Sequence, residues 1–342
     1  MTCTDRSAKN SADTAIEADG LVRSFTIGRG RKSRTIEAVK ELSFTVEAGE
    51  RLAFIGPNGA GKSTSIKMLT GILFPTAGSA TVLGLVPWQQ RKELALRIGT
   101  LFGQRSQLWN ELTPRTSLGV LGAIFGMTDP QTAARLGELG PILEADELYD
   151  QPLRGLSLGQ RMRCELTACM LHSPEMLFLD EPTIGLDLLG KQVFRDLLVR
   201  VNNELGTTVL LTSHDVADIE RVAERAIVVN HGTVIYDNTV EAMRGELLAT
   251  KRITVGLTAP ALAATTRADQ DSPAGITTAD RLPGVAVSDG AANELIVEVD
   301  TTQVPVRQVL DLLLAELPVI DLSIADPPLE AVIGEIYQRP PT

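Results

Sequence analysis

The sequence predicts an α/β domain built on a largely parallel sheet, with an inserted helical subdomain, followed by a small α+β domain. Three observations predict this fold class. Short apolar, strand-like segments alternate with longer helical patterns over residues 21–243, which is typical of parallel α/β sheets. Residues 94–147 are mostly helical in pattern and interrupt the strands. Residues 258–275, rich in Ala, Thr, Pro and Asp, read as a long surface loop within a second set of strands and helices.

The predicted domains follow from these changes in pattern. Residues 1–19 are polar and acidic and are expected to form a disordered lead-in. Residues 20–245 are expected to form the α/β domain, with the helical subdomain at about 104–160. Residues 246–342 are expected to form the accessory α+β domain.

Each predicted element rests on hydrophobic periodicity. The first domain has four apolar segments that indicate buried strands, at residues 51–55, 175–179, 207–212 and 226–230. In the second domain, alternating patterns predict strands at residues 253–257, 285–287, 295–299 and 319–324, and helices at residues 306–317 and 329–337.

Composition excludes several classes of function. The formal net charge is -11, which disfavours non-specific binding to nucleic acids or anionic lipids. The three cysteines, Cys3, Cys164 and Cys169, lack paired or metal-ligand spacing, so we expect a reducing compartment and buried thiols at Cys164 and Cys169. No segment approaches the roughly 18 to 20 apolar residues of a membrane-spanning helix, so any membrane role requires a partner.

A glycine-rich loop follows the first buried strand and precedes a helical run, which is the context in which the Walker A pattern has meaning. Its residues are Gly56, Pro57, Asn58, Gly59, Ala60, Gly61, Lys62, Ser63 and Thr64. Backbone N–H groups of such a loop surround a β-phosphate, and the lysine adds a positive charge beside the β- and γ-phosphates. Ser63 is the expected ligand of Mg²⁺. The pattern therefore predicts binding of a nucleoside triphosphate with Mg²⁺.

Two acidic residues end the apolar strand at residues 175–179. A parallel sheet delivers such carboxylates to its carboxyl edge, beside the phosphate loop. We expect Asp180 to belong to the coordination shell of Mg²⁺, and Glu181 to orient and polarise the attacking water.

The segment Leu156-Ser157-Leu158-Gly159-Gln160 resembles the signature motif of ABC ATPases. It begins a helix, so a serine hydroxyl and exposed N–H groups can hold a γ-phosphate. The resemblance implies a head-to-tail dimer in which Ser157, Gly159 and Gln160 of one copy close over the ATP held by the other. Leu158 stands where the family most often has glycine.

Four further residues match the family's motifs in the family's order. Gln104 resembles the Q-loop glutamine, which implies a contact with Mg²⁺ and with the attacking water. Asp187, in Ile184-Gly185-Leu186-Asp187, resembles the D-loop residue at the dimer interface. His214 resembles the switch histidine that contacts the γ-phosphate, and Phe25 resembles the aromatic residue that stacks on adenine. The resemblance thus implies Glu181, His214, Gln104 and Lys62 as the catalytic set.

The resemblance implies an ATPase that drives a separate membrane permease from the cytoplasmic face of the membrane, pairs with a second copy of itself, and binds no nucleic acid. Residues 102–109 and 158–163 are similar to the branch that exports drugs, lipids and polysaccharides, in which Trp109 would face the permease. Burial of Trp109 inside the helical subdomain is the alternative. An importer ATPase shares every catalytic motif and remains an alternative function, whereas a soluble ABC ATPase acting on ribosomes or DNA would normally show two cassettes, a coiled-coil arm or a basic surface.

Overall fold

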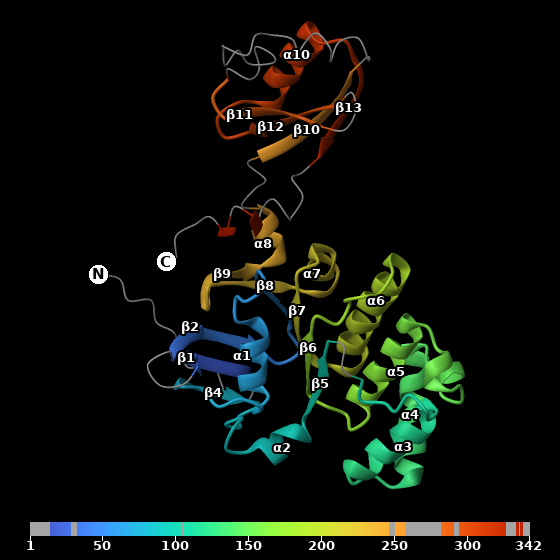
Figure 1. Cartoon of the computed structure of the whole chain (residues 1–342). Coiled ribbons are helices and arrows are strands. Elements are labelled where there is room, and N and C mark those ends of the chain that lie inside the picture. Colours follow the sequence, from blue (N-terminus) through green and yellow to red (C-terminus); the bar gives the residue numbers. More distant parts are fainter. Residues whose placement is uncertain are drawn as a thin grey trace. The chain divides into compact units, whose positions relative to one another are not determined.

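The computed structural model describes residues 14–28, 33–103, 106–245, 250–257, 282–290, 294–325, 333–334 and 336–337. The chain divides into two compact units, Met1–Val240 and Glu241–Gln338 (Figure 1). Each unit has its own hydrophobic core. The sequence predicts a domain boundary after residue 245, where α8 (Val240–Gly245) ends. In the structure the units divide five residues earlier, after Val240, the first residue of this helix.

The first unit is built on a nine-stranded mixed sheet in the order β4-β1-β2-β9-β8-β3-β7-β6-β5. The strands β8, β3, β7, β6 and β5 run parallel to one another, while β1 pairs antiparallel with both β2 and β4. The bounds are β1 Thr14–Ile27, β2 Arg34–Glu47, β3 Arg51–Ile55, β4 Ala77–Val82, β5 Ile98–Phe102, β6 Met176–Asp180, β7 Thr208–Ser213, β8 Arg225–Asn230 and β9 Thr233–Thr239. The predicted α/β fold class is therefore confirmed, and the four strands predicted in this unit are β3, β6, β7 and β8.

The predicted disordered lead-in, residues 1–19, extends too far, because β1 begins at Thr14. Ile16 is fully buried and lies opposite Val46 of β2 and Val82 of β4. Neighbouring Glu17 and Asp19 make the segment polar in composition, so pairing with strands distant in sequence decides its structure. The rest of the predicted lead-in, residues 1–13, lies outside the described residues.

A strand also interrupts the segment predicted to be mostly helical, because β5 lies within residues 94–147 and pairs in parallel with β6. A five-residue apolar run cannot be assigned to helix or strand by periodicity alone. Gly99 fits this strand for a packing reason, since a Cβ there would lie 2.5 Å from the carbonyl oxygen of Cys169. Helix α5 (Leu158–Met170) therefore packs closely on the sheet at this point.

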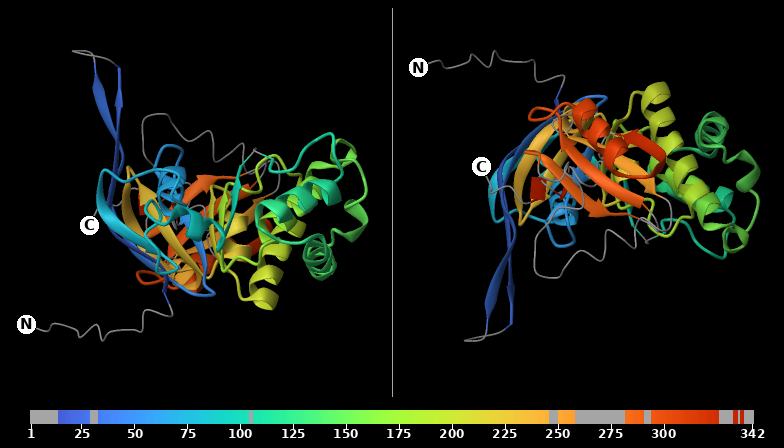
Figure 2. Two further views of the ribbon diagram at one scale, coloured as in Figure 1. Left: turned by 90° about the horizontal axis from the view of Figure 1, so that it is seen from below. Right: turned by 90° about the horizontal axis from the view of Figure 1, so that it is seen from above.

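The helical part of the unit gathers at one side of the sheet, and the free ends of β1 and β2 project away as a hairpin (Figure 2). Helices α3 (Pro114–Ile124) and α4 (Asp129–Leu143) begin at side-chain caps, Thr113 and Thr128, as expected for threonine before a helix. They are followed by short 3₁₀ turns, by α5 and by α6 (Leu188–Leu205). The remaining helices are α1 (Lys62–Leu69), α2 (Arg91–Ala95) and α7 (Val216–Val222).

The two described cysteines lie on α5 and are buried, as predicted. Burial raises the pKa of the Cys164 thiol and of the Cys169 thiol to about 12. Both therefore act as small apolar side chains. Cys3 lies outside the described residues.

The second unit is a four-stranded antiparallel sheet in the order β11-β12-β10-β13, with helix α10 (Val306–Glu316) contributing to its core. The strands are β10 (Thr250–Leu257), β11 (Val285–Asp289), β12 (Glu294–Asp300) and β13 (Val319–Ala325), which confirms the strands and the first helix predicted here. Of the helix predicted at residues 329–337, residues 333–334 and 336–337 are described and helical. The loop predicted at residues 258–275 lies outside the described residues. Among the described helices, none combines the length and the apolar character that crossing a bilayer requires.

Candidate active site

The loop between β3 and α1 has a backbone that depends on glycine. Gly59 and Gly61 adopt positive φ values of 85° and 106°, a region that disfavours residues with a Cβ. A Cβ on Gly61 would also lie 2.6 Å from the carbonyl oxygen of Ala38, and one on Gly56 would lie 2.4 Å from that of Val229. The loop is therefore packed against β2 and β8, with Pro57, Asn58, Ala60 and Thr64 completing the segment that leads into α1.

Lys62 is the first residue of α1, and its side chain turns back over the loop. Its Nζ donates a hydrogen bond to the carbonyl oxygen of Gly56 at 2.6 Å and lies 3.8 Å from Oε1 of Glu181. Burial lowers the pKa of the Lys62 ammonium, although the charges of Glu181 and Asp180 act in the opposite direction. A cation held among oxygen atoms at this point matches what the phosphates of a nucleotide require.

Asp180, at the end of β6, shares one carboxylate oxygen between two hydroxyl groups. Ser63 Oγ donates to Asp180 Oδ1 at 2.9 Å, and Thr212 Oγ1 donates to the same oxygen at 2.7 Å. A hydroxyl and a carboxylate side by side are hard oxygen ligands of the kind that Mg²⁺ prefers, with water and phosphate oxygens completing its shell. Ser63 and Asp180 therefore fit the Mg²⁺ ion predicted at this position.

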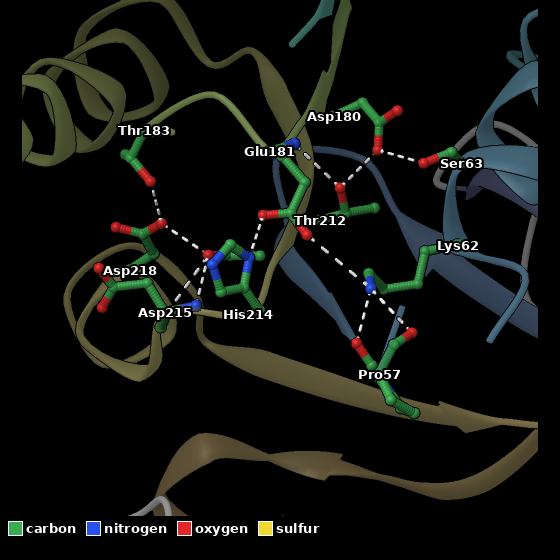
Figure 3. A network of polar contacts seen from close by, with 12 residues as sticks. Pro57, Lys62, Ser63, Asp180, Glu181, Thr183, Thr212, His214, Asp215 and Asp218 are labelled. Carbon is green, nitrogen blue, oxygen red and sulfur yellow. Dashed lines mark hydrogen bonds and ion pairs between the residues drawn. The ribbon is translucent and has the colours of Figure 1, made fainter. Parts of the chain in front are cut away.

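Glu181 is held in a strained backbone conformation beside His214 (Figure 3). Its φ is 53°, and its N–H is directed at Thr212, with the carbonyl oxygen at 3.1 Å and Oγ1 at 3.0 Å. His214 Nδ1 lies 2.7 Å from Glu181 Oε2, which places the N–H on Nδ1, because a carboxylate only accepts. Strained residues persist where surrounding contacts determine them and are frequent at active sites. The ends of β6 and β7 thus bring the predicted acid and the predicted switch histidine into direct contact.

Thr212 was not predicted as a site residue, and it joins the two acids. We expect Thr212→Val, which keeps the side chain's shape but removes its hydroxyl, to lower kcat by about 10-fold to 100-fold through misplacement of Asp180 and Glu181. ATP affinity should change by less than about twofold, since the lysine and the loop are untouched. Steady-state kinetics and ATP titration check this.

The matched control for that prediction is Thr208→Val, at the other end of β7. Thr208 Oγ1 accepts a hydrogen bond from the N–H of Gly49 at 2.8 Å, so this variant also loses a buried hydroxyl. It should be similarly destabilised and yet retain wild-type kcat. Equal losses of activity in the two variants would contradict a positioning role for Thr212.

The predicted signature and D-loop residues form a second group at two helix ends. Ser157 caps α5 in a reciprocal capping box with Gln160, and Asp187 Oδ1 caps α6 by accepting from the N–H of Gly190 at 2.7 Å. The two ends are adjacent, because a Cβ on Gly159 would lie 3.8 Å from Cα of Gly190. The described hydrogen bonds of Ser157, Gln160 and Asp187 are local to these helix ends.

Two predicted residues have no described contact with either group. Gln104 lies outside the described residues. Phe25 is half-buried on β1, and the guanidinium of Arg23 lies over its ring at 4.6 Å from the centroid. Adenine stacking by Phe25 therefore stays a prediction, with a cation already on one face of the ring.

A second residue missed by the sequence analysis connects the loop after β5 to α5. Glu165 is buried on α5, accepts a hydrogen bond from the hydroxyl of Ser106, and accepts another from the N–H of Gln107 at 3.0 Å. A lone acid in an amphipathic helix carries no signal of such a contact. By contrast, β7 is an apolar strand that ends in the polar residues Thr212 and Ser213, just before His214. This change to polar residues could have indicated Thr212.

Comparison with known proteins agrees with this geometry. A family model described as "ABC transporter" matches residues 39–184. The ATP-binding protein NatA of Bacillus subtilis is 30% identical over 62% of this chain and 86% of its own length. The chain belongs to the ABC transporter ATP-binding family. This ABC ATPase is also 34% identical to the daunorubicin/doxorubicin resistance protein DrrA of Streptomyces peucetius, over 68% of each chain. The fold agrees with the dimeric post-hydrolysis structure of the cassette MJ0796 bound to ADP and Pi, with a TM-score of 0.58 and 24% identity over 66% of this chain and 98% of that one.

Membership confirms the resemblance stated from the motifs, and with it the activity: the chain is an ATP-binding protein and an ATPase. The structure brings Lys62, Ser63, Asp180, Glu181 and His214 into one site. Ser157, Gly159, Gln160 and Asp187 lie together elsewhere on the same unit.

Proposed function

We propose that this ABC ATPase binds ATP with Mg²⁺ between two copies of itself and drives a separate membrane permease that exports its substrate. The observation that supports it is the division of the site into two groups. One contains the lysine, the two acids and the histidine, and the other is a serine-capped helix end whose hydrogen bonds are local. A helix N-terminus binds anions, so the second group is suited to the γ-phosphate of ATP held by a partner copy.

In this proposal the loop from Gly56 to Thr64 holds the phosphates, and Lys62 neutralises their charge. Ser63, Asp180 and Gln104 hold Mg²⁺, which neutralises charge on the phosphates when bound. Glu181 orients the attacking water, and His214 contacts the γ-phosphate. These roles rely on positioning and electrostatics, which is what phosphoryl transfer demands.

The contributions from the second copy are Ser157, Gly159 and Gln160 at the γ-phosphate and Asp187 along the interface. Phe25 is the proposed adenine contact within the first copy. Leu158, which replaces the family's usual glycine, is 46% exposed. Closure of the two copies on ATP, followed by hydrolysis and release, would drive the permease.

The assignment to export rests on the relatives' names. DrrA is a resistance ATP-binding protein, and a relative 34% identical over 70% of this chain is the Nod factor export ATP-binding protein I of Sinorhizobium fredii. Because these relatives are named as ATP-binding proteins of resistance and export systems, we propose that the chain is held at the cytoplasmic face of the membrane by its permease.

Trp109 is a candidate contact with the permease, because its side chain is 45% exposed. We expect tagged full-length chain to capture the permease from solubilised membranes, and Trp109→Ser to reduce that capture by about 10-fold, since exposed aromatic side chains are frequent anchors of interfaces. Ile27→Ser, which changes an apolar residue of β1 that is 58% exposed, is the control. Substrate movement out of the nucleotide-containing compartment in reconstituted vesicles supports export, whereas movement toward it would overturn the exporter assignment.

A further inference from the structure

The first turn of α7, directly after His214, is tied to α6 by charged side chains. Asp215 caps α7 and lies 2.6 Å from Lys191 Nζ and 3.1 Å from a guanidinium nitrogen of Arg195. Asp218, one turn further, accepts a hydrogen bond from Arg195 Nε at 2.5 Å. One guanidinium from α6 therefore bridges two carboxylates that flank the start of α7.

Asp218 is fully buried and also binds two hydroxyl groups from different segments (Figure 3). Thr183 Oγ1 donates to Asp218 Oδ2 at 2.5 Å, and Ser213 Oγ donates to the same oxygen at 2.7 Å. Ser213 immediately precedes His214, and Thr183 follows Glu181 by two residues. We call Arg195, Asp218, Thr183 and Ser213 the α6–α7 clamp.

The Thr183 segment leads directly to the second group of site residues. The N–H of Leu186 donates to the carbonyl oxygen of Thr183 at 3.2 Å, forming a turn that ends at Asp187. Within this turn, a Cβ on Gly185 would lie 3.3 Å from Cδ2 of Leu158. Two hydrogen bonds and the intervening chain therefore connect His214, through Ser213, Asp218 and Thr183, to Asp187 and the N-terminal end of α5.

Holding α6 against α7 does not require a buried ion pair. Well-packed apolar residues often stabilise such a contact as well or better, and a buried charge is costly unless it is fully bonded. What a carboxylate adds is a shared acceptor for two hydroxyls, one on the last residue of β7 and one in the turn after β6. The clamp is therefore built to fix the relative position of the end of β7 and this turn.

We propose that Arg195 and Asp218 are positioning residues that couple the switch segment at His214 to the D-loop segment at Asp187. The inference rests on the proposed roles of His214 and Asp187 in the ATP-bound pair of copies. A shift of His214 changes the position of Ser213, and Asp218 passes that change to Thr183. The state of the γ-phosphate in one copy is thereby transmitted to the surface that faces the other copy.

The test removes the hydroxyls rather than the charges, so that the buried ion pair stays intact. In purified full-length chain, we expect Thr183→Val and Ser213→Ala each to lower kcat by about 5-fold to 10-fold, with ATP affinity within about twofold of wild type. Both hydroxyls bind Oδ2 of Asp218, and the Ser213 hydroxyl also accepts from the N–H of Asp215 at 3.0 Å. Because the two hydroxyls share one carboxylate, the double variant should be no slower than about the slower single variant. Thr183→Ser, which restores the hydroxyl, should restore kcat.

The control uses an exposed ion pair between the same two helices. Arg221 Nε lies 2.7 Å from Asp196 Oδ1, and both side chains are more than half exposed. Asp196→Asn should leave kcat and Tm unchanged. The proposal is overturned if either hydroxyl variant keeps wild-type kcat, if the two effects multiply in the double variant, or if Thr183→Ser is as slow as Thr183→Val.

Failure of this inference is distinguishable from failure of the proposed function. A wild-type chain that does not pair in the presence of ATP overturns the proposed function, whatever the hydroxyl variants do. A wild-type chain that pairs and hydrolyses ATP, with hydroxyl variants of wild-type kcat, overturns the clamp alone.

Discussion

We expect Glu181→Gln to lower steady-state ATP hydrolysis by about 100-fold to 10,000-fold, the range for loss of a positioned general base. Glutamine keeps the size and most contacts of the side chain but cannot accept a proton from water. The distance of 2.7 Å between His214 Nδ1 and Glu181 Oε2 allows the amide oxygen to replace the carboxylate as acceptor. ATP binding should persist, and the ATP-bound pair of copies should accumulate.

Three measurements check this outcome: phosphate release, ATP titration, and molecular mass in solution with and without ATP. Glu204→Gln, a half-exposed glutamate on α6, is the control and should behave as wild type. Ordinary turnover by Glu181→Gln would remove this residue from its proposed role. Loss of turnover with no pairing on ATP would contradict the two-copy site while leaving the role of Glu181 intact.

The second large effect concerns Lys62. We expect Lys62→Met to weaken ATP binding by about 10-fold to 100-fold, since charge-assisted hydrogen bonds contribute about 1.5–3 kcal/mol each. The fold should be retained, because methionine matches the buried aliphatic stem. Burial lowers the pKa of the Lys62 ammonium, which means that the nucleotide-free fold disfavours this charge. Removal of the charge is offset by loss of the hydrogen bond to the carbonyl oxygen of Gly56, so we expect a Tm close to that of wild type, measured by calorimetry.

Lys67→Met is the matched control, because Lys67 lies in the last turn of the same helix. It should bind ATP as tightly as wild type. Wild-type affinity in Lys62→Met would contradict the proposed phosphate contact. Comparison of Lys62→Met with Glu181→Gln also separates ATP binding from hydrolysis, since the first variant should bind ATP weakly and the second should retain it.

Sequence reasoning performed well where a local pattern determines a local structure. The strand at Arg51–Ile55 contains a continuous apolar run, residues 52–55, which is buried on both faces, and the loop after it contains glycines at the positions where φ is positive. Ser157 was predicted to begin a helix, and it is the N-cap of α5 in the structure. Each of these features depends only on residues within a few positions of one another.

Features that depend on pairing between segments far apart in the sequence were predicted less well. The polar composition of residues 14–19 predicts a lead-in rather than a strand, because Ile16 becomes buried only by pairing with β2 and β4. The edge strand β5 lies within the segment predicted to be mostly helical, because five residues are too few to distinguish a strand from a helix by hydrophobic periodicity. Asp218 looks like an ordinary acid in the first turn of a helix, a position that favours negative charge.

The sequence by itself therefore determined the family, the nucleotide and the identity of the acids, the lysine and the histidine. These follow from motifs in which the order and spacing of residues carry the chemistry. Only the tertiary structure decided that Thr212 joins the two acids and that Asp218 ties the His214 segment to the Thr183 segment. The physical reason is that hydrogen bonds of buried side chains are set by strand order and helix packing, which bring together residues about 30 positions apart without leaving a periodic trace in the chain.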